Sequence, residues 1–215
     1  MTAGIRSTFL ACCETARRLL ASAAVADRWD EPSALARMTV GALAGHLMRA
    51  VTSVDAYLDR EPPSSGQALD APGYFLSIEG LDDPDLDSEL HAAIRARAST
   101  EAEVGHAGVV VAWDAAVARL RDRLDGASTD RMLPALGGRV LTLDEYLVTR
   151  LVEMLVHADD LAVSVDAETP TFPADAEAAV IGCLVEVGRR RHGSTAVIRA
   201  LTRRERDAVR ALRVL

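Results

Sequence analysis

TLDEYLVTRLVEMLVHADDLAVSV, residues 142–165, is the stretch that decides the fold. Thr142 and Glu145 stand at the capping-box spacing, in which side chains satisfy the free backbone N–H groups at the start of a helix. Leu, Val, Met and Ala then cover most of the helical circumference, which is typical of a helix buried on nearly all sides. The pattern predicts a largely buried helix from Thr142 to about Val165.

A narrow polar stripe interrupts this apolar surface at spacings of three and four. It consists of Tyr146, Arg150, Glu153, His157 and Asp160. Glu153 and His157 are i and i+4, so their side chains rise from one face and can converge on a single ion. An exposed Glu–His pair is the ordinary alternative for this spacing, and the apolar helix around the pair argues against it.

A third ligand is expected from another helix, and His46 is the candidate. Thr39 can cap a helix whose apolar residues recur at steps of three and four, and His46 lies on its inward stripe. The spacing alone is equally consistent with a histidine that only belongs to the core. The remaining histidines occur near charged residues, where solvated surface is the default expectation: His91, His106 and His192.

The composition favours an all-α protein. Hydrophobic residues make up 49% of the 215 residues and aromatic residues only 4%, so the core must consist of small aliphatic side chains of the kind that pack helix on helix. The formal net charge of −8 provides no broad basic surface. Nucleic acid is therefore not an expected partner.

The sequence gives no sign of a membrane partner or of an oxidising compartment. Its longest apolar run near a span, residues 108–113, is too short to cross a bilayer. Cys12, Cys13 and Cys183 form no paired framework, so reduced thiols are expected. These features predict a cytoplasmic protein.

Periodicity and capping patterns predict a four-helix bundle. Its long helices are expected near residues 5–26, 39–60, 101–125 and 143–165. A long connection over 61–84, which contains Pro and Gly, is expected to lie over the bundle in the manner of a substrate lid. The smaller expected elements are a helix near 85–98, a capping box at Thr100–Glu103, a tiny β-hairpin from 131–134 and 138–141, and helices near 173–191, 195–201 and 203–212.

The same patterns divide the chain into two parts. Residues 1–168 are expected to form the helical bundle that carries the candidate ligands. Residues 169–215 are expected to form a C-terminal helical extension packed on that bundle.

Two segments of the chain resemble the signatures of a known family. Trp29, Pro32 and the stretch TVGALAGHL at 39–47 resemble the N-terminal signature of the mycothiol-dependent maleylpyruvate isomerase family, which belongs to the DinB-like bundles. EMLVHADDLA at 153–162 resembles the second signature of the same family. Both segments occur in the expected order, and the pair is more specific than either segment alone.

The resemblance covers about residues 5–165 and implies a DinB-like four-helix bundle with a metal site. The implied ligands are His46, Glu153 and His157. Three protein ligands leave a fourth position open on zinc, which is the arrangement of a catalytic site. Asp160 matches an acidic position of the family pattern, either as a partner of the metal-binding histidine or as a solvent-facing residue.

The family analogy further implies that mycothiol is the thiol cosubstrate. A coordinated thiol would attack a small electrophilic substrate, and the outcome is either thiol S-transfer or isomerisation. Met38 and Ala42 depart from the family pattern, and residues 169–215 are short for the C-terminal domain of some relatives. Two other interpretations stay open: a site for Fe(II), Ni or Mn with the same ligands, and a non-catalytic metal- or thiol-binding sensor.

Overall fold

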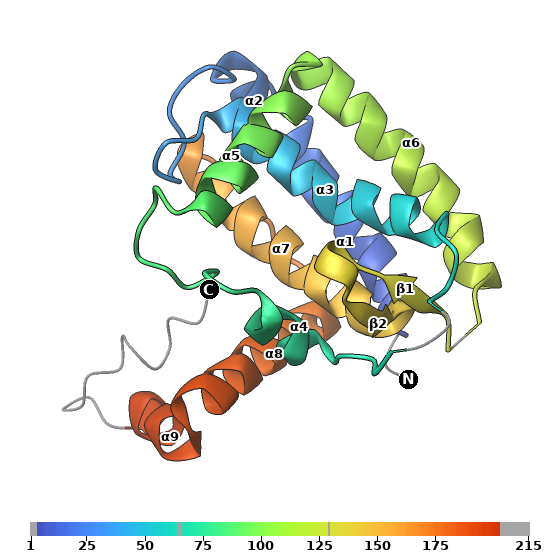
Figure 1. The fold of residues 1–215 in the computed structure, drawn as a ribbon. Helices are drawn as coiled ribbons and strands as arrows, with labels where there is room; N and C mark the ends of the chain where they lie inside the picture. The colour runs from blue at the N-terminus through green and yellow to red at the C-terminus, as the bar shows by residue number, and fades with distance from the viewer. Residues whose placement is uncertain (1–3, 64–65, 129, 203–215) are drawn as a thin grey trace.

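The computed structural model describes residues 4–63, 66–128 and 130–202, and its regular secondary structure is helical apart from one two-stranded sheet. Its long bundle helices are α1 (Ile5–Leu20), α3 (Val40–Leu58), α6 (Gly105–Gly126) and α7 (Leu143–Ser164). In Figure 1 they run side by side around a shared core, with α3 packed against both α6 and α7. The prediction of an all-α bundle is confirmed.

The first predicted helix is two helices. After α1 the chain starts again as α2 (Ala23–Asp27), because the Ser22 hydroxyl accepts a hydrogen bond from the backbone N–H of Val25. Serine competes with the helical backbone in this way and favours helix ends. The prediction of one continuous helix over 5–26 was therefore wrong at this point.

The start of α7 is as predicted, with one change in its partners. The Thr142 hydroxyl accepts a hydrogen bond from the Glu145 N–H at 3.2 Å. The Glu145 carboxylate accepts one from the Ala71 N–H at 2.7 Å. Glu145 thus holds the first residue of another helix, α4 (Ala71–Ser77), against the beginning of α7.

That helix, α4, lies within the segment predicted to be a loop, and the prediction was wrong for these residues. Asp70 caps it by accepting a hydrogen bond from the Gly73 N–H at 2.9 Å. Pro72 lies in the first turn, where its missing N–H costs nothing. The Pro72–Gly73 pair therefore starts a helix rather than a turn, and α4 packs on α7.

The Thr39 hydroxyl caps α3 as predicted, accepting a hydrogen bond from the Ala42 N–H at 3.1 Å. Partway along α3, Gly45 lies against α5 (Glu89–Ala102). A Cβ at this glycine would stand 2.9 Å from the Ala98 carbonyl oxygen. The absence of a side chain thus allows the backbones of α3 and α5 to approach closely, next to His46.

The predicted capping box at residues 100–103 does not open a helix. Thr100 lies in the last turn of α5, and Ser88 caps that helix instead. The fully buried Ala98 belongs to the face that α5 packs on α3. Tertiary packing extends α5 past the local start signal, and α6 begins at Gly105.

The predicted β-hairpin is present. β1 (Met132–Pro134) and β2 (Val140–Thr142) pair antiparallel with Leu133 opposite Leu141. Gly137 and Gly138 have φ of 69° and 76°, values that non-glycine residues rarely adopt. The hairpin turns at these glycines and leads directly into α7.

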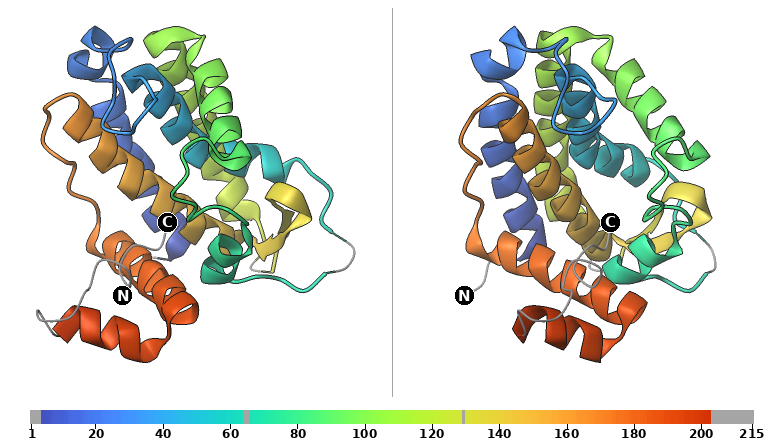
Figure 2. Two further views of the ribbon diagram at one scale, coloured as in Figure 1. Left: turned by 60° about the vertical axis from the view of Figure 1, so that its left-hand side comes forward. Right: turned by 90° about the vertical axis from the view of Figure 1, so that its left-hand side faces the viewer.

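Two helices follow the bundle, α8 (Ala174–His192) and α9 (Ser194–Thr202). Figure 2 shows them beyond one end of the bundle, where α8 packs on α1, α4 and α7. Pro173 precedes α8 as its cap rather than as its first residue. The predicted helix at 203–212 lies outside the described residues, and the division at residue 168 stays a prediction.

No helix in the described part of the chain combines the length and the apolar character that a membrane span requires.

Candidate metal centre

The structure brings together the three side chains that the sequence singled out. His46 projects from α3, and Glu153 and His157 project from α7, which packs on it. Glu153 Oε2 lies 3.5 Å from His46 Nε2 and 3.3 Å from His157 Nε2. One ligand atom from each residue lies within 4.8 Å of the other two.

These distances suit a single metal ion. Ligand atoms about 2.0–2.2 Å from a tetrahedral zinc ion stand roughly 3.3–3.6 Å apart. The contacts of 3.5 and 3.3 Å that Glu153 Oε2 makes with the two imidazoles fall in this interval. Two imidazole nitrogens and one carboxylate oxygen are also a common donor set for zinc. The residues therefore fit a four-coordinate divalent ion.

The second nitrogen of one imidazole already has a partner. His157 Nδ1 lies 3.0 Å from Asp160 Oδ2, one turn further along α7. When this nitrogen carries the proton and donates to the carboxylate, Nε2 presents its lone pair toward Glu153 and His46. Of the two predicted positions for Asp160, the structure shows contact with His157 rather than a free solvent-facing side chain.

The charges of the cluster support one another. Burial raises the pKa of the Glu153 carboxyl, but His157, His46 and the Arg150 charge outweigh this effect and hold the pKa well below its ordinary value. Burial lowers the pKa of His157, whereas Asp160 and Glu153 together raise it to about 9. In the metal-free protein the cluster thus retains a proton that a bound cation would replace.

A comparison with known families identifies the chain. The profile described as the mycothiol maleylpyruvate isomerase N-terminal domain matches residues 9–162. The chain belongs to this family. The match contains all three convergent side chains and Asp160, and it confirms the resemblance seen in the two signatures. No curated protein and no solved structure matches the chain.

Membership of the mycothiol maleylpyruvate isomerase family relates the chain to mycothiol, and the structure adds a candidate metal-binding triad. Within the described residues, this triad is the one group of three or more His, Cys, Asp or Glu side chains whose ligand atoms converge. All three residues of the triad lie within the segment that matches the family.

Arg150 lies beside the triad, and the ring of Tyr74 lies near Arg150. Arg150 was visible in the sequence as part of the polar stripe, and it lies next to Glu153. Tyr74 on α4 was missed, because its segment was taken for a loop. The signal that could have found it is Asp70 followed by Pro72, a cap with a proline in the first helical turn.

The other histidines lie outside the triad, and they are half-buried rather than fully solvated as expected. His106 Nε2 lies 2.8 Å from the Leu20 carbonyl oxygen, and its ring meets the Trp29 ring edge-on. His91 Nδ1 lies 3.1 Å from the Asp85 carbonyl oxygen. Both rings tie neighbouring segments together.

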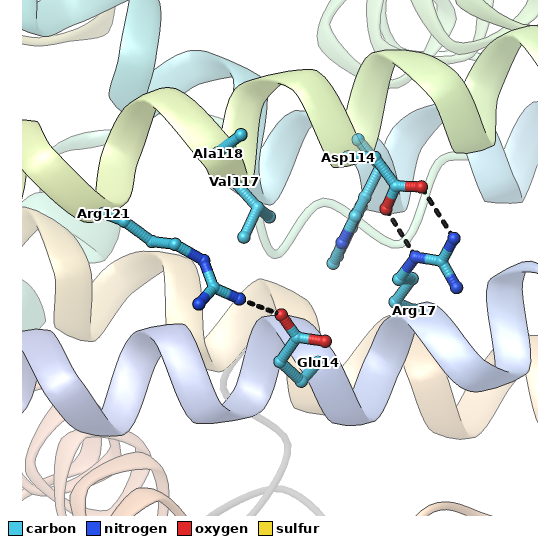
Figure 3. Close-up of a pocket in the computed structure, with 7 residues that line it drawn as sticks. Glu14, Arg17, Asp114, Val117, Ala118 and Arg121 are labelled. Atoms are coloured by element: carbon cyan, nitrogen blue, oxygen red, sulfur yellow. Dashed lines mark hydrogen bonds and ion pairs between the residues drawn. The ribbon is translucent and has the colours of Figure 1, made fainter.

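A surface pocket occurs elsewhere, between α1 and α6 (Figure 3). Its charged side chains are already paired within it, Arg17 with Asp114 and Arg121 with Glu14. None of the triad residues lines this pocket. These ion pairs connect the two helices. Because the charged groups of the pocket bind each other, the candidate metal centre is the stronger candidate for a functional site.

Proposed function

We propose that His46, Glu153 and His157 hold a divalent metal ion, zinc in the first place, and that the protein uses it to activate a low-molecular-weight thiol for attack on a small electrophile. Mycothiol is the thiol that the family relates to this chain. The observation that carries the proposal is the convergence of one ligand atom from each of the three side chains, with Glu153 Oε2 at tetrahedral spacing from both imidazole nitrogens.

The protein groups have separate tasks in this site. Glu153 contributes one negative charge, and the two imidazoles contribute neutral nitrogen donors, so the filled site keeps a net positive charge. Three protein ligands leave one position for an exogenous group. A metal ion bound there lowers the pKa of a coordinated thiol, so that the thiolate is present at neutral pH.

Asp160 acts on the site through His157. By accepting a hydrogen bond from the Nδ1–H group it fixes the tautomer and the orientation of the imidazole, and it makes Nε2 a stronger metal ligand. Gly45 has a related task, because the close approach of α3 and α5 at this point sets the position of the neighbouring His46.

The cysteines of the chain support an exogenous thiol. Cys12, Cys13 and Cys183 are all buried and free. Burial raises the pKa of Cys12 and of Cys183 to about 12, and that of Cys13 well above its ordinary value. None of them supplies thiolate at neutral pH, so the nucleophile of a thiol-dependent reaction has to come from a bound molecule.

The reaction begins in the same way for both outcomes. The thiol proton passes to solvent, and a sulfur lone pair forms a C–S bond to the electrophilic carbon. In transfer, a leaving group departs with its bonding electrons, or a proton adds to the new carbanion. In isomerisation, addition to a double bond allows rotation about that bond, after which the C–S bond breaks and the thiolate leaves unchanged.

The test begins with metal analysis of the purified protein and continues with turnover. Stoichiometric zinc and consumption of electrophiles with mycothiol, faster than with other low-molecular-weight thiols, would support the proposal. Metal and thiol binding without turnover of any electrophile would favour the sensor instead. Absence of a stoichiometric divalent metal after growth and purification with zinc would contradict both.

A further inference from the structure

Arg150 is a buried cation beside the triad whose terminal nitrogens are not engaged. The residue is 8% exposed, and it lies on α7 one turn before Glu153. Its Nε donates a hydrogen bond to the hydroxyl of the adjacent Thr149 at 3.1 Å. Its Nη2 lies 3.8 Å from Glu153 Oε1, which is longer than a hydrogen bond.

The terminal nitrogens are also reachable. Nη1 and Nη2 of Arg150 donate no hydrogen bond to any residue in the described part of the chain. The fully enclosed side-chain atoms that lack a hydrogen bond there belong to Glu101, Trp113 and His192. Because the Arg150 nitrogens are not among them, they are not fully enclosed by the protein and keep some exposed area that a ligand can contact.

Aromatic rings hold the guanidinium in place. Its carbon lies 4.9 Å from the centre of the Tyr146 ring and 6.0 Å from that of Tyr74. The Tyr146 hydroxyl donates to the Ser53 hydroxyl at 2.9 Å, which fixes that ring between α3 and α7. A guanidinium stacked on fixed rings is preorganised, so little side-chain entropy is lost when it binds a ligand.

Metal binding reduces the negative charge that balances the Arg150 guanidinium. In the metal-free protein, Glu153 is its nearest carboxylate. Once Glu153 neutralises part of the charge of a metal ion, a buried guanidinium is left without a full counter-charge, which is costly in a desolvated site. A ligand that brings its own anion restores the balance.

We propose that Arg150 binds a carboxylate carried by the molecule that reacts at the metal centre. This inference rests on the proposed function, because it places the carboxylate relative to a ligand in the open metal position. A planar carboxylate matches the fork of the two terminal nitrogens and forms paired, charge-assisted hydrogen bonds with it. The ring of Tyr74 lies 6.0 Å from the guanidinium carbon, and its hydroxyl makes no hydrogen bond to a described residue.

The separation of the two subsites follows from Glu153. Its Oε2 faces the imidazoles and its Oε1 faces Arg150, so one carboxylate group separates the metal position from the guanidinium. A molecule with a sulfur or electrophilic carbon and a carboxylate a few bonds apart spans this distance. The end of the reacting molecule that enters the site therefore carries a carboxylate a few bonds from the reacting atom.

The experiment compares two probes that differ only in charge. The protein is loaded with Co²⁺, whose visible absorption changes when a thiol enters its coordination sphere, and is titrated with 3-mercaptopropionate and with 3-mercaptopropanamide. The carboxylate is expected to bind about tenfold to a hundredfold more tightly than the amide, in keeping with charge-assisted hydrogen bonds to a buried arginine. Equal affinities for both probes are the first of two results needed to overturn the proposal.

A second arm assigns the carboxylate to the thiol or to the electrophile. With 2-mercaptoethanol in the thiol position, crotonate and crotonamide are titrated as matched compounds that lack sulfur. A carboxylate preference in either arm supports the role of Arg150 and states which molecule carries the acid. No preference in both arms overturns it.

Variants link the preference to one side chain. Arg150→Met, similar in length and uncharged, should take up Co²⁺ and lose the preference, whereas Arg150→Lys should keep part of it. Arg49→Met is the matched control, because Arg49 lies near His46 but is paired with Glu101 at 2.6 Å. A preference that persists in Arg150→Met would also overturn the proposal.

Measurements on the wild-type protein distinguish failure of the proposed function from failure of this inference. Failure to bind Co²⁺ or Zn²⁺ would remove the proposed function and this inference together. Stoichiometric metal binding with no carboxylate preference would remove the role of Arg150 alone. Because the probe pairs are compared on the wild-type protein, the result does not depend on the folding of any variant.

Discussion

Helix α3 carries ionisable groups at two places, and the two clusters are built in opposite ways. Near its C-terminal end Asp55 is almost fully buried, and its carboxylate accepts hydrogen bonds from Arg119 Nε at 2.7 Å and Arg123 Nη1 at 2.6 Å. Arg123 also donates to Asp59 at 2.8 Å. Donors and acceptors match, so this cluster is complete without a ligand.

The cluster near the N-terminal end of α3 is not complete. The nitrogens of His46 and His157 face one oxygen of Glu153 at 3.5 and 3.3 Å, and the available proton of His157 Nδ1 is directed away, to Asp160. When a cation replaces the proton that His157 retains in the metal-free protein, lone pairs of both imidazoles and of Glu153 converge on a common point. The two clusters are alike in charge and burial. They differ in the directions of their donors and acceptors, which are all matched in the first cluster and not in the second.

The largest expected effect is the loss of metal and of thiol-dependent activity in His157→Ala. Removal of a ligand should weaken zinc binding by more than about a hundredfold, because loss of a ligand's hydrogen-bond partner alone costs tenfold to a hundredfold. The cap and the apolar surface of α7 should keep the helical circular dichroism unchanged. A variant that retains stoichiometric zinc and full turnover would make His157 a core histidine.

Asp160→Asn tests whether the outer partner of the cluster matters, and its effect should be intermediate. Zinc affinity is expected to fall by about tenfold to a hundredfold, since the imidazole of His157 loses its anionic acceptor. Asp159→Asn is the control on the same helix, because its carboxylate accepts from Thr169 at 2.6 Å and does not contact the triad. Equal affinities in the two variants, measured by competition with a chelator, would assign Asp160 no role in metal binding.

Asp55→Ala should affect the complete cluster and leave the other untouched. We expect the free energy of unfolding to fall by about 1–3 kcal/mol, because the variant leaves arginine donors without their buried acceptor. Zinc content should not change, since Asp55 lies about 13 Å along α3 from His46. As a control, Asp59→Ala removes an exposed carboxylate and should lower the free energy of unfolding, measured by urea denaturation, by less than about 1 kcal/mol. A loss of zinc in Asp55→Ala would contradict the separation of the two clusters.

The last expected effect is a pH dependence of the metal-free protein. The lowered pKa of Glu153 stabilises the fold above its ordinary value of 4.5, and this contribution is lost as pH falls through the lowered folded pKa. The raised pKa of His157 stabilises the fold fully below 6.5, and this contribution is lost as pH rises through about 9. Stability in the presence of a chelator should therefore decline between pH 6.5 and 9.

The variant His157→Gln provides the reference for that pH dependence. Its stability should fall less over the same range, because the group with the raised pKa is gone. Zinc affinity of the wild-type protein should move in the opposite direction and increase with pH, since metal and proton compete for the same imidazole. Parallel stability profiles for the variant and the wild-type protein would show that His157 is not coupled to folding.

Prediction from the sequence succeeded where the signal is local. The caps at Thr39 and Thr142 and the apolar surface of α7 act within one or two turns, so they could be read directly. Prediction failed at α4 and at residues 100–103, where tertiary contacts decide. A helix of seven residues has too short a periodicity to detect, and the cap at Thr100 is overridden by the packing of α5 on α3.

The sequence by itself determined the helical bundle, the buried helix with one polar stripe, and membership of the family that the two signatures resemble. Only the tertiary structure decided that His46 Nε2 faces Glu153, that Asp160 contacts His157, and that Arg150 is left with unengaged nitrogens beside Tyr74. The physical reason is the range of the forces involved. Caps and periodicity act along a single helix, whereas distances between helices depend on how whole surfaces pack.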